Sequence, residues 1–194
     1  MMNLKPFALI LMIAVILYSC GTPEPNNTDE EQTTQINVPL PNADSMYKYI
    51  EEQLAFGPRV PNTKANKACA VYLKDKLTQF GFETIIQVGS ATRYDGEKLS
   101  INNIIASYKP NTNNRILLCA HWDSRHIADH DPNPANRTKP VPGANDGGSG
   151  VAVLLEIARQ IQMYSLAVGI DIVLFDTEDQ GAPRNINSIV QDDW

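Results

Sequence analysis

A histidine and an aspartate stand two positions apart in the segment HWDSR, directly after an apolar run. Side chains two positions apart on an extended strand point to the same side. His121 and Asp123 therefore share one face at the end of a predicted strand, where the imidazole could bind a metal and the carboxylate could orient it. A hydrogen-bonded turn uses the same residue types, so the pair alone leaves both interpretations open.

Two further acidic clusters follow along the chain. Asp146 lies in GANDGGSG, where glycines permit a tight turn before a predicted helix and leave the carboxylate room to face a ligand. Glu178 and Asp179 lie in FDTEDQG, directly after a strongly apolar segment. The alternatives are that Asp146 only caps its helix and that the adjacent acids are solvated.

All three clusters stand where one predicted element ends or the next begins. Ligands of open α/β sheets bind at the carboxyl ends of the strands, so the three clusters are expected to meet there. Carboxylate oxygens together with an imidazole suit zinc or a similar divalent ion. The sequence therefore predicts a metal site at one end of a sheet.

The elements that must position these residues follow from hydrophobic periodicity and turn signals. Short β-branched segments predict strands, the last of them apolar enough to be covered on both faces. Residues 123–144, rich in proline, asparagine and aspartate, predict a long functional loop. Alternating strands and helices indicate an α/β fold, a three-layer sandwich with a mixed, largely parallel sheet. The predicted helices are 43–56, about 63–80 and 148–164, and the predicted strands are 82–90, 101–108, 115–120 and 169–176.

The N-terminal segment is typical of export. Residues 1–19 contain one lysine followed by an uncharged apolar run too short to span a membrane comfortably, which predicts a signal peptide. The closing LYSC resembles a bacterial lipobox, so Cys20 is the predicted lipidation site on a cell-envelope membrane, in the periplasm or the outer membrane; an ordinary signal peptide or a short anchor is the alternative. Residues 20–41 have the composition of a disordered tether, leaving 42–194 as the folded domain.

The net charge bears on the partners of the protein, and the cysteine content bears on disulfide formation. Among 194 residues, 16 Lys and Arg face 22 Asp and Glu, giving a net charge of −6, which argues against nucleic acid as a partner. In an exported protein Cys69 and Cys119 could form a disulfide. Free buried thiols are the alternative that their positions in a predicted helix and strand favour.

The stretch from AHWDSR through GANDGGSG, with VGIDIVLFDTEDQG, FGPRVPNT and LSINNIIASY, resembles the bacterial, animal-type glutaminyl cyclases, relatives of zinc-dependent aminopeptidases. The resemblance runs from about residue 42 to the end. It implies a zinc-exopeptidase-like fold with Asp146 and Asp179 as zinc ligands and Glu178 as the general acid/base. It implies that His121 is a metal ligand only with a second metal or in a rearranged site. Asp123 then lies behind His121 and orients it without binding the metal. The loop residues His126, His130, Asp129 and Asp131 match no ligand and are expected to be solvated.

The resemblance implies a peptide substrate whose N-terminal glutamine closes to pyroglutamate with release of ammonia. A zinc aminopeptidase and a non-catalytic surface lipoprotein fragment are the alternatives. Members of the family continue past the position matching Trp194, where a histidine zinc ligand is expected. The catalytic domain is therefore expected to be incomplete here, with an exposed apolar sheet edge and weak metal binding.

Overall fold

The computed structural model describes residues 38–183. The predicted signal peptide, the lipidation site Cys20 and most of the predicted tether lie outside the described residues, as do residues 184–194. None of the described helices is long and apolar enough to cross a membrane. The elements, in chain order, are α2 (Ala43–Leu54), α3 (Lys64–Gln79), β1 (Glu83–Thr92), β2 (Lys98–Tyr108), β3 (Arg115–His121), the 3-10 turn η1 (Pro134–Asn136), α4 (Gly148–Tyr164) and β4 (Gly169–Phe175).

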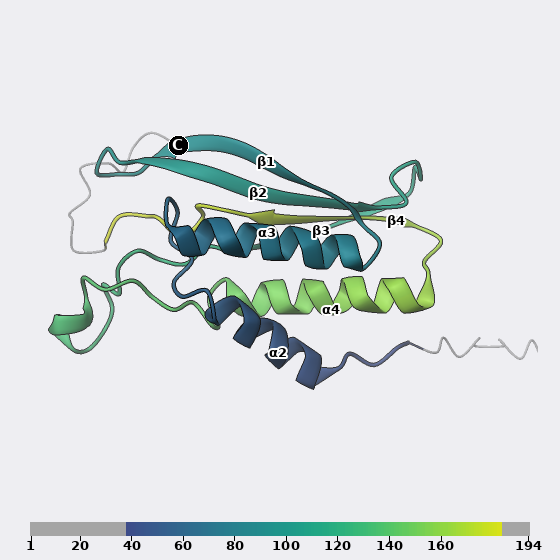
Figure 1. The fold of residues 1–194 in the computed structure, drawn as a ribbon, viewed down its shortest axis with the longest axis horizontal. Helices are drawn as coiled ribbons and strands as arrows, with labels where there is room; N and C mark the ends of the chain where they lie inside the picture. The colour runs from purple at the N-terminus through teal and green to yellow at the C-terminus, as the bar shows by residue number, and fades with distance from the viewer. Residues whose placement is uncertain (1–37, 184–194) are drawn as a thin grey trace, which may run out of the picture. The chain divides into compact units, whose positions relative to one another are not determined.

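The strands form a four-stranded sheet in the order β1-β2-β4-β3 (Figure 1). β1 and β2 are joined by a short hairpin and pair antiparallel, as do β2 and β4. β3 and β4 pair parallel because α4 crosses over between them. The mixed sheet is confirmed, but two of the three pairings in the described part are antiparallel, so this part is not largely parallel.

Helices cover one face of the described sheet. α3 packs on β1 and β2, α4 packs on β3, and α2 packs on the outside of α4 (Figure 1). In β4 the side chains of Ile170, Ile172 and Leu174 are buried, whereas Phe175 is exposed. The sequence predicted β4 to be covered on both faces, and within residues 38–183 only the helix-facing side is.

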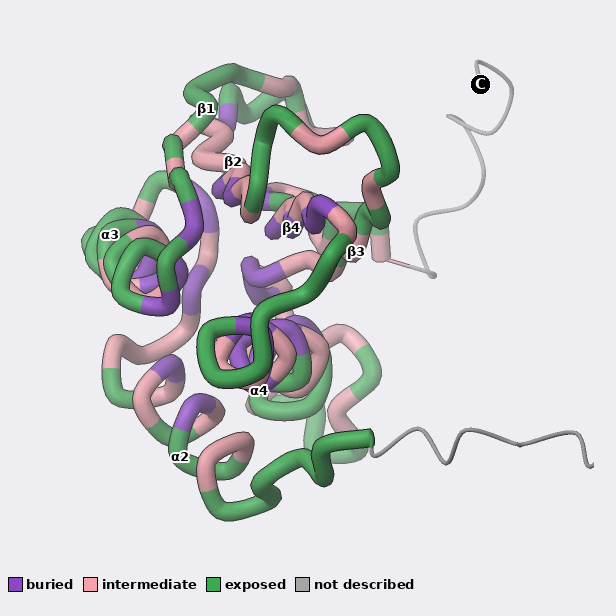
Figure 2. The backbone as a smooth tube through the Cα atoms, turned by 90° about the vertical axis from the view of Figure 1, so that its right-hand side faces the viewer, coloured by how far each residue is buried: buried purple, intermediate pink, exposed green. Residues whose placement is uncertain are grey.

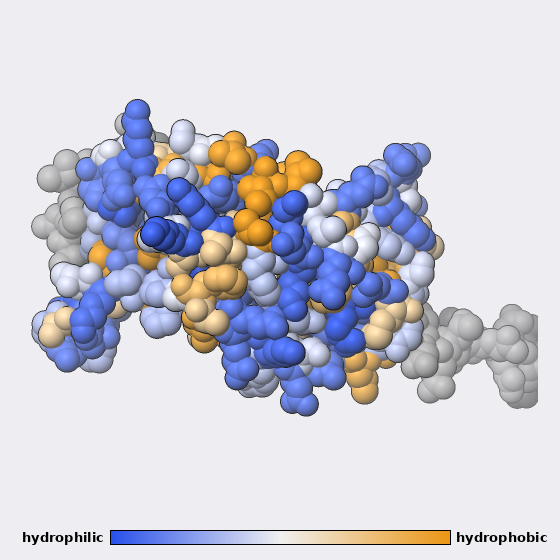
Figure 3. Space-filling view, in the orientation of Figure 1, coloured by the Kyte–Doolittle hydropathy of each residue, from blue (hydrophilic) through white to orange (hydrophobic). Residues whose placement is uncertain are grey.

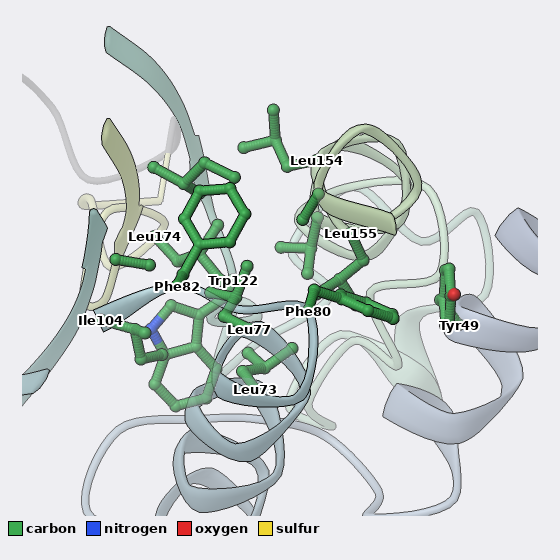
Figure 4. Packing of buried hydrophobic residues seen from close by; sticks show 14 of the residues in the cluster. Tyr49, Leu73, Leu77, Phe80, Phe82, Ile104, Trp122, Leu154, Leu155 and Leu174 are labelled. Atoms are coloured by element: carbon green, nitrogen blue, oxygen red, sulfur yellow. The ribbon is translucent and has the colours of Figure 1, made fainter. Parts of the chain in front are cut away.

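The core lies between the two central helices and the sheet, where the buried stretches of these elements face one another (Figure 2). Leu73 and Leu77 of α3, Leu155 of α4 and the indole of Trp122 are fully buried and pack together with strand residues (Figure 4). Trp122 thus points into the core, while its neighbours His121 and Asp123 point away from it, as the period of an extended strand predicts.

Apolar side chains also remain on the outside of the described residues. Ile85 on β1 and Leu117 on the edge strand β3 are exposed, and Figure 3 shows hydrophobic side chains gathered near the sheet among mostly hydrophilic ones. Cys119 of β3 is exposed and Cys69 of α3 is buried, and both thiols are free. The predicted disulfide alternative is therefore wrong, and so is the expectation that Cys119 is buried.

Three connections meet at one end of the sheet. The segments after β3 and β4 leave it from the carboxyl ends of these parallel strands, on the left in Figure 1, and the β1–β2 hairpin turns there as well. The predicted loop 123–144 is irregular apart from the short turn η1. This end of the sheet is where the three predicted clusters should meet.

Candidate functional site

The three clusters do meet, with His121 at their centre. His121 Nε2 lies 2.9 Å from Asp146 Oδ1, and its Nδ1 lies 3.3 Å from Asp123 Oδ1 and 3.6 Å from Glu178 Oε2. The side chains come from the end of β3, the turn before α4 and the segment after β4. Residues separated by 25 to 57 positions in the sequence are thereby brought within hydrogen-bond reach.

Asp123 is the buried anchor of the cluster. Its carboxylate has no exposed surface and accepts the backbone N–H groups of Glu178 and Asp179, both at 3.2 Å. It also accepts a bond from Gln180 Nε2 at 3.0 Å. Asp123 was predicted to orient His121, and it additionally fixes the backbone of the predicted catalytic segment.

The turn before α4 presents Asp146 to His121 instead of capping the helix. The N-cap residue is Gly147, at φ +81°, and within the described residues no side chain caps this helix. A Cβ at Gly147 would lie 2.6 Å from the Asp123 carbonyl oxygen and 3.3 Å from His121 Cε1. Only glycine fits there, because both the backbone conformation and the close approach exclude a side chain. The alternative that Asp146 acts only as a helix cap is therefore wrong.

Asp179 lies beside a positive charge. Arg125 Nη1 is 3.3 Å from Asp179 Oδ1, and Arg125 itself is held by Asp129 at 2.8 Å. Burial raises the pKa of Asp179, the negative charge of Asp146 raises it further, and Arg125 opposes both effects. Asp129 was expected to be solvated, but its side chain is only 10% exposed and pairs with Arg125, so that expectation is wrong.

His121 carries the charge that balances these acids. Its pKa is raised to about 9, first by the hydrogen bond with Asp123, and further by the charges of Asp123 and Glu178 and the hydrogen bond with Asp146; burial opposes the shift. A protonated imidazole has no free lone pair and cannot ligate a metal. In this arrangement His121 acts as a hydrogen-bond donor to Asp146, and its assignment as a ligand only in a rearranged or two-metal site stays a prediction.

The donor chemistry suits zinc, although the described residues do not form a complete set of ligands. Asp146 is largely exposed, and the mutual repulsion of Asp146 and Asp179 is the situation that a bound cation relieves. Within residues 38–183, no group of three or more His, Cys, Asp or Glu is arranged to hold a metal ion. Asp146 and Asp179 therefore fit as two of the ligands, and their roles stay predictions.

Glu178 stands on a strained backbone beside a cavity. The preceding residue, Thr177, has φ +70°, which is a rare conformation for a β-branched residue and costs about 1–3 kcal/mol. Glu178 is largely exposed and lines a cavity of about 460 Å³ under the β1–β2 hairpin. Tyr94 and Gln180 also line this cavity. An exposed carboxylate next to an open cavity can exchange protons with a bound molecule.

Sequence reasoning missed a buried arginine that holds two of the loops together. Arg59 is fully buried, and its guanidinium donates to the carbonyl oxygens of Trp122 at 3.0 Å, Pro142 at 2.8 Å and Gly143 at 2.6 Å. It therefore ties the segment of His121 and Asp123 to the turn that carries Asp146. No local pattern could reveal this role, because the partners lie 63 to 84 positions away.

The described residues form a mixed α/β fold of the zinc-exopeptidase-like kind. Residues 103–183, which include all five clustered residues, match the model of Peptidase family M28. The resemblance proposed from the sequence is confirmed by solved structures at about half sequence identity.

Three of these structures illustrate the similarity. A Tannerella forsythia glutaminyl cyclase is 54% identical, with TM-score 0.77 over 80% of this chain and 54% of its own. A Zn-dependent exopeptidase from Parabacteroides distasonis is 52% identical, with TM-score 0.77 over 81% and 54%. A Bacteroides thetaiotaomicron glutaminyl cyclase is 49% identical, with TM-score 0.76 over 78% and 52%. The chain thus spans about half the length of the structures it matches.

Proposed function

We propose that the protein is a zinc-dependent glutaminyl-peptide cyclotransferase, which converts the N-terminal glutamine of peptides to pyroglutamate. The observation that supports this most is the convergence of His121, Asp123, Asp146, Glu178 and Asp179 at one end of the sheet, in a chain about half identical to glutaminyl cyclases. Asp146 and Asp179 hold the zinc in this proposal, and Glu178 transfers the proton. Bound zinc supplies a Lewis acid for the side-chain amide carbonyl of the substrate.

The reaction is intramolecular, so alignment of the substrate supplies much of the rate. The α-amine of the peptide attacks its own side-chain amide carbon, forming the ring C–N bond, and the bond from that carbon to the amide nitrogen breaks. Glu178 accepts a proton from the attacking amine and returns it to the departing ammonia. During both transfers Asp123 holds the Glu178 backbone in place, because its carboxylate accepts a hydrogen bond from the Glu178 N–H group.

The proposal is tested by two product assays on the full-length, zinc-loaded protein. A peptide with N-terminal glutamine should release ammonia and yield a pyroglutamyl peptide. A peptide with N-terminal leucine should release no free leucine. Rapid release of leucine without cyclisation would overturn the proposal.

An exopeptidase is the second candidate, favoured by the similarity to the Parabacteroides distasonis Zn-dependent exopeptidase. The same carboxylates would serve it, with Glu178 activating a water against the first peptide bond. Residue types at the site do not separate the two reactions. The leucine assay does, because only the exopeptidase cleaves that bond.

We also propose that Cys20 carries a lipid that anchors the protein to a bacterial envelope membrane. The support is the sequence: an apolar run ending in LYSC, followed by residues of tether composition. Cys20→Ala should leave the precursor uncleaved or release the protein from the membrane fraction. Normal processing with unchanged membrane association would contradict the anchor.

A further inference from the structure

A chain of polar side chains connects the β1–β2 hairpin to the buried anchor Asp123. Tyr94 Oη lies 3.5 Å from His126 Nε2, and His126 Nδ1 lies 3.0 Å from Gln180 Oε1. Gln180 Nε2 then lies 3.0 Å from both Asp123 Oδ2 and the Ser124 carbonyl oxygen. His126 was expected to be a solvated loop residue, and this network shows that the expectation was wrong.

The direction of every bond in this chain is determined from its inner end. The Asp123 carboxylate and the Ser124 carbonyl only accept hydrogen bonds, so the amide nitrogen of Gln180 must face them and its oxygen must face His126. His126 Nδ1 therefore carries a proton and donates to Gln180. In a neutral imidazole Nε2 then accepts, and the Tyr94 hydroxyl donates to it.

The surroundings of His126 favour the neutral imidazole that this chain requires. Burial lowers its pKa, and the positive charges of Arg93 and Arg125 lower it further, while the Gln180 bond and Asp95 oppose this effect. Its ring also stacks at a tilt on Tyr94, with centroids 6.2 Å apart. The other histidine of this loop, His130, is 63% exposed and lies 3.8 Å from Asp129.

We propose that His126 and Gln180 are positioning residues for the reaction, which hold Asp123 in the orientation that fixes the Glu178 and Asp179 backbone. Gln180 and Asp179 N–H share Asp123 Oδ2, while Glu178 N–H and His121 share Oδ1. Loss of the outer bond lets the Gln180 amide rotate, and Asp123 then loses one of the donors that hold its plane. Tyr94 lines the same cavity as Glu178, so the chain links the wall of the cavity to the proton-transferring segment.

The test compares substitutions of His126 that differ in one hydrogen bond. In asparagine the amide nitrogen is bonded to Cγ, as Nδ1 is in histidine, so His126→Asn keeps a donor toward Gln180. In glutamine the nitrogen is one bond further out, so His126→Gln keeps bulk and polarity but loses that donor. His126→Leu loses both bonds, and His130→Leu is the control from the same loop.

Cyclisation kinetics of the full-length, zinc-loaded protein give the main readout, and this arm depends on the proposed function. We expect His126→Leu and His126→Gln to lower kcat about tenfold, with KM changed less than twofold and a melting temperature near that of the wild type. His126→Asn should stay within threefold of the wild type, and His130→Leu should be unchanged. Equal kcat for the asparagine and glutamine variants, or a wild-type kcat for His126→Gln, would overturn the proposal.

A second readout separates this proposal from the proposed function. Nitrogen-15 NMR of the wild-type protein at neutral pH should show His126 as a neutral imidazole with its proton on Nδ1. A proton on Nε2, or on both nitrogens, would overturn the hydrogen-bond chain whatever the protein catalyses. If the wild-type protein does not cyclise glutaminyl peptides, the proposed function fails while this measurement still decides the state of the chain.

Discussion

The helix-packed core and the loop end of the sheet are held together by different forces. The core around Leu73, Leu77 and Leu155 is an apolar cluster whose contacts have no preferred direction. The loop end is held by directed hydrogen bonds to Arg59 and Asp123 and by glycines that no other residue can replace. A change in the core should therefore lower the free energy of unfolding and leave the site intact. A change at the loop end should lower activity or let the loops of the site move out of place.

The largest effect is expected at Glu178. Glu178→Gln in the full-length protein should lower turnover by about 10²–10⁴-fold, the usual range for a general acid/base, with zinc content unchanged. Turnover is followed by ammonia release, and zinc is measured by mass spectrometry. If this substitution emptied the metal site while Asp179→Asn did not, the roles of the two residues would have to be exchanged.

Substitutions of Arg59 test whether one buried side chain holds the loops of the site together. Arg59→Met removes the guanidinium donors of three carbonyl oxygens, of which, among the described residues, only the Gly143 oxygen keeps another donor, the Gly148 N–H at 3.1 Å, so the free energy of unfolding should fall by about 4 kcal/mol. Arg59→Lys keeps the charge but not the fork of donors, and should lose about half as much. Urea unfolding measures both variants. The exposed Arg137→Met is the control, and an Arg59→Met protein as stable as this control would contradict the proposed locking role.

Substitution of Leu77 tests the apolar core, the other region in this comparison. It is fully buried on α3, so Leu77→Ala should lower the free energy of unfolding by about 3 kcal/mol through lost burial and the cavity left behind. Because the Leu77 side chain is apolar and makes none of the hydrogen bonds that hold the site, kcat should stay near that of the wild type below the melting temperature. Val71→Ala, on the exposed side of the same helix, should change neither quantity. A large fall in kcat for Leu77→Ala would show that the two regions are coupled.

The smallest expected effect is the pH dependence of stability at Asp176. Burial raises the pKa of this carboxyl to about 6, against hydrogen bonds from Asn66 and the Asn102 backbone that lower it. Since the folded pKa exceeds the ordinary value, the stabilising contribution is complete below about pH 4 and is lost as the pH rises through 6. Relative to Asp176→Asn, the wild type should lose on the order of 2 kcal/mol between pH 4 and 7. Urea unfolding at both pH values measures this difference, and an increase would contradict it.

Local sequence patterns predicted the elements well. The helix predicted at 148–164 begins and ends where α4 does, and the strand predicted at 169–176 is one residue longer than β4. Such segments are predictable because the period of their apolar residues reflects the one face that must be buried. The strand β1 extends two residues past its predicted end, since pairing with β2 continues into the hairpin.

The gathering of the site residues was also predictable in part. The spacing of His121 and Asp123, the glycines around Asp146 and the position of Glu178 after an apolar strand all indicated one end of a sheet, and the parallel pairing of β3 with β4 places them there. The hydrogen-bond partner of each side chain was not predictable. Asp146 meets His121 instead of capping α4, and Asp129 pairs with Arg125, because these choices depend on which side chain arrives from a distant segment.

The sequence by itself determined the α/β class, the element order, the glycine turn at Gly147 and the residue types available for metal and proton chemistry, because propensity, periodicity and backbone freedom act over a few neighbouring residues. The tertiary structure decided the buried roles of Arg59, His126 and Gln180. Each of these side chains makes hydrogen bonds to partners more than fifty positions away, and the pairing of β3 with β4 and the packing of α4 on the sheet fix which groups come within reach. Directed bonds of that kind depend on positions in space, so no local pattern in the sequence contains them.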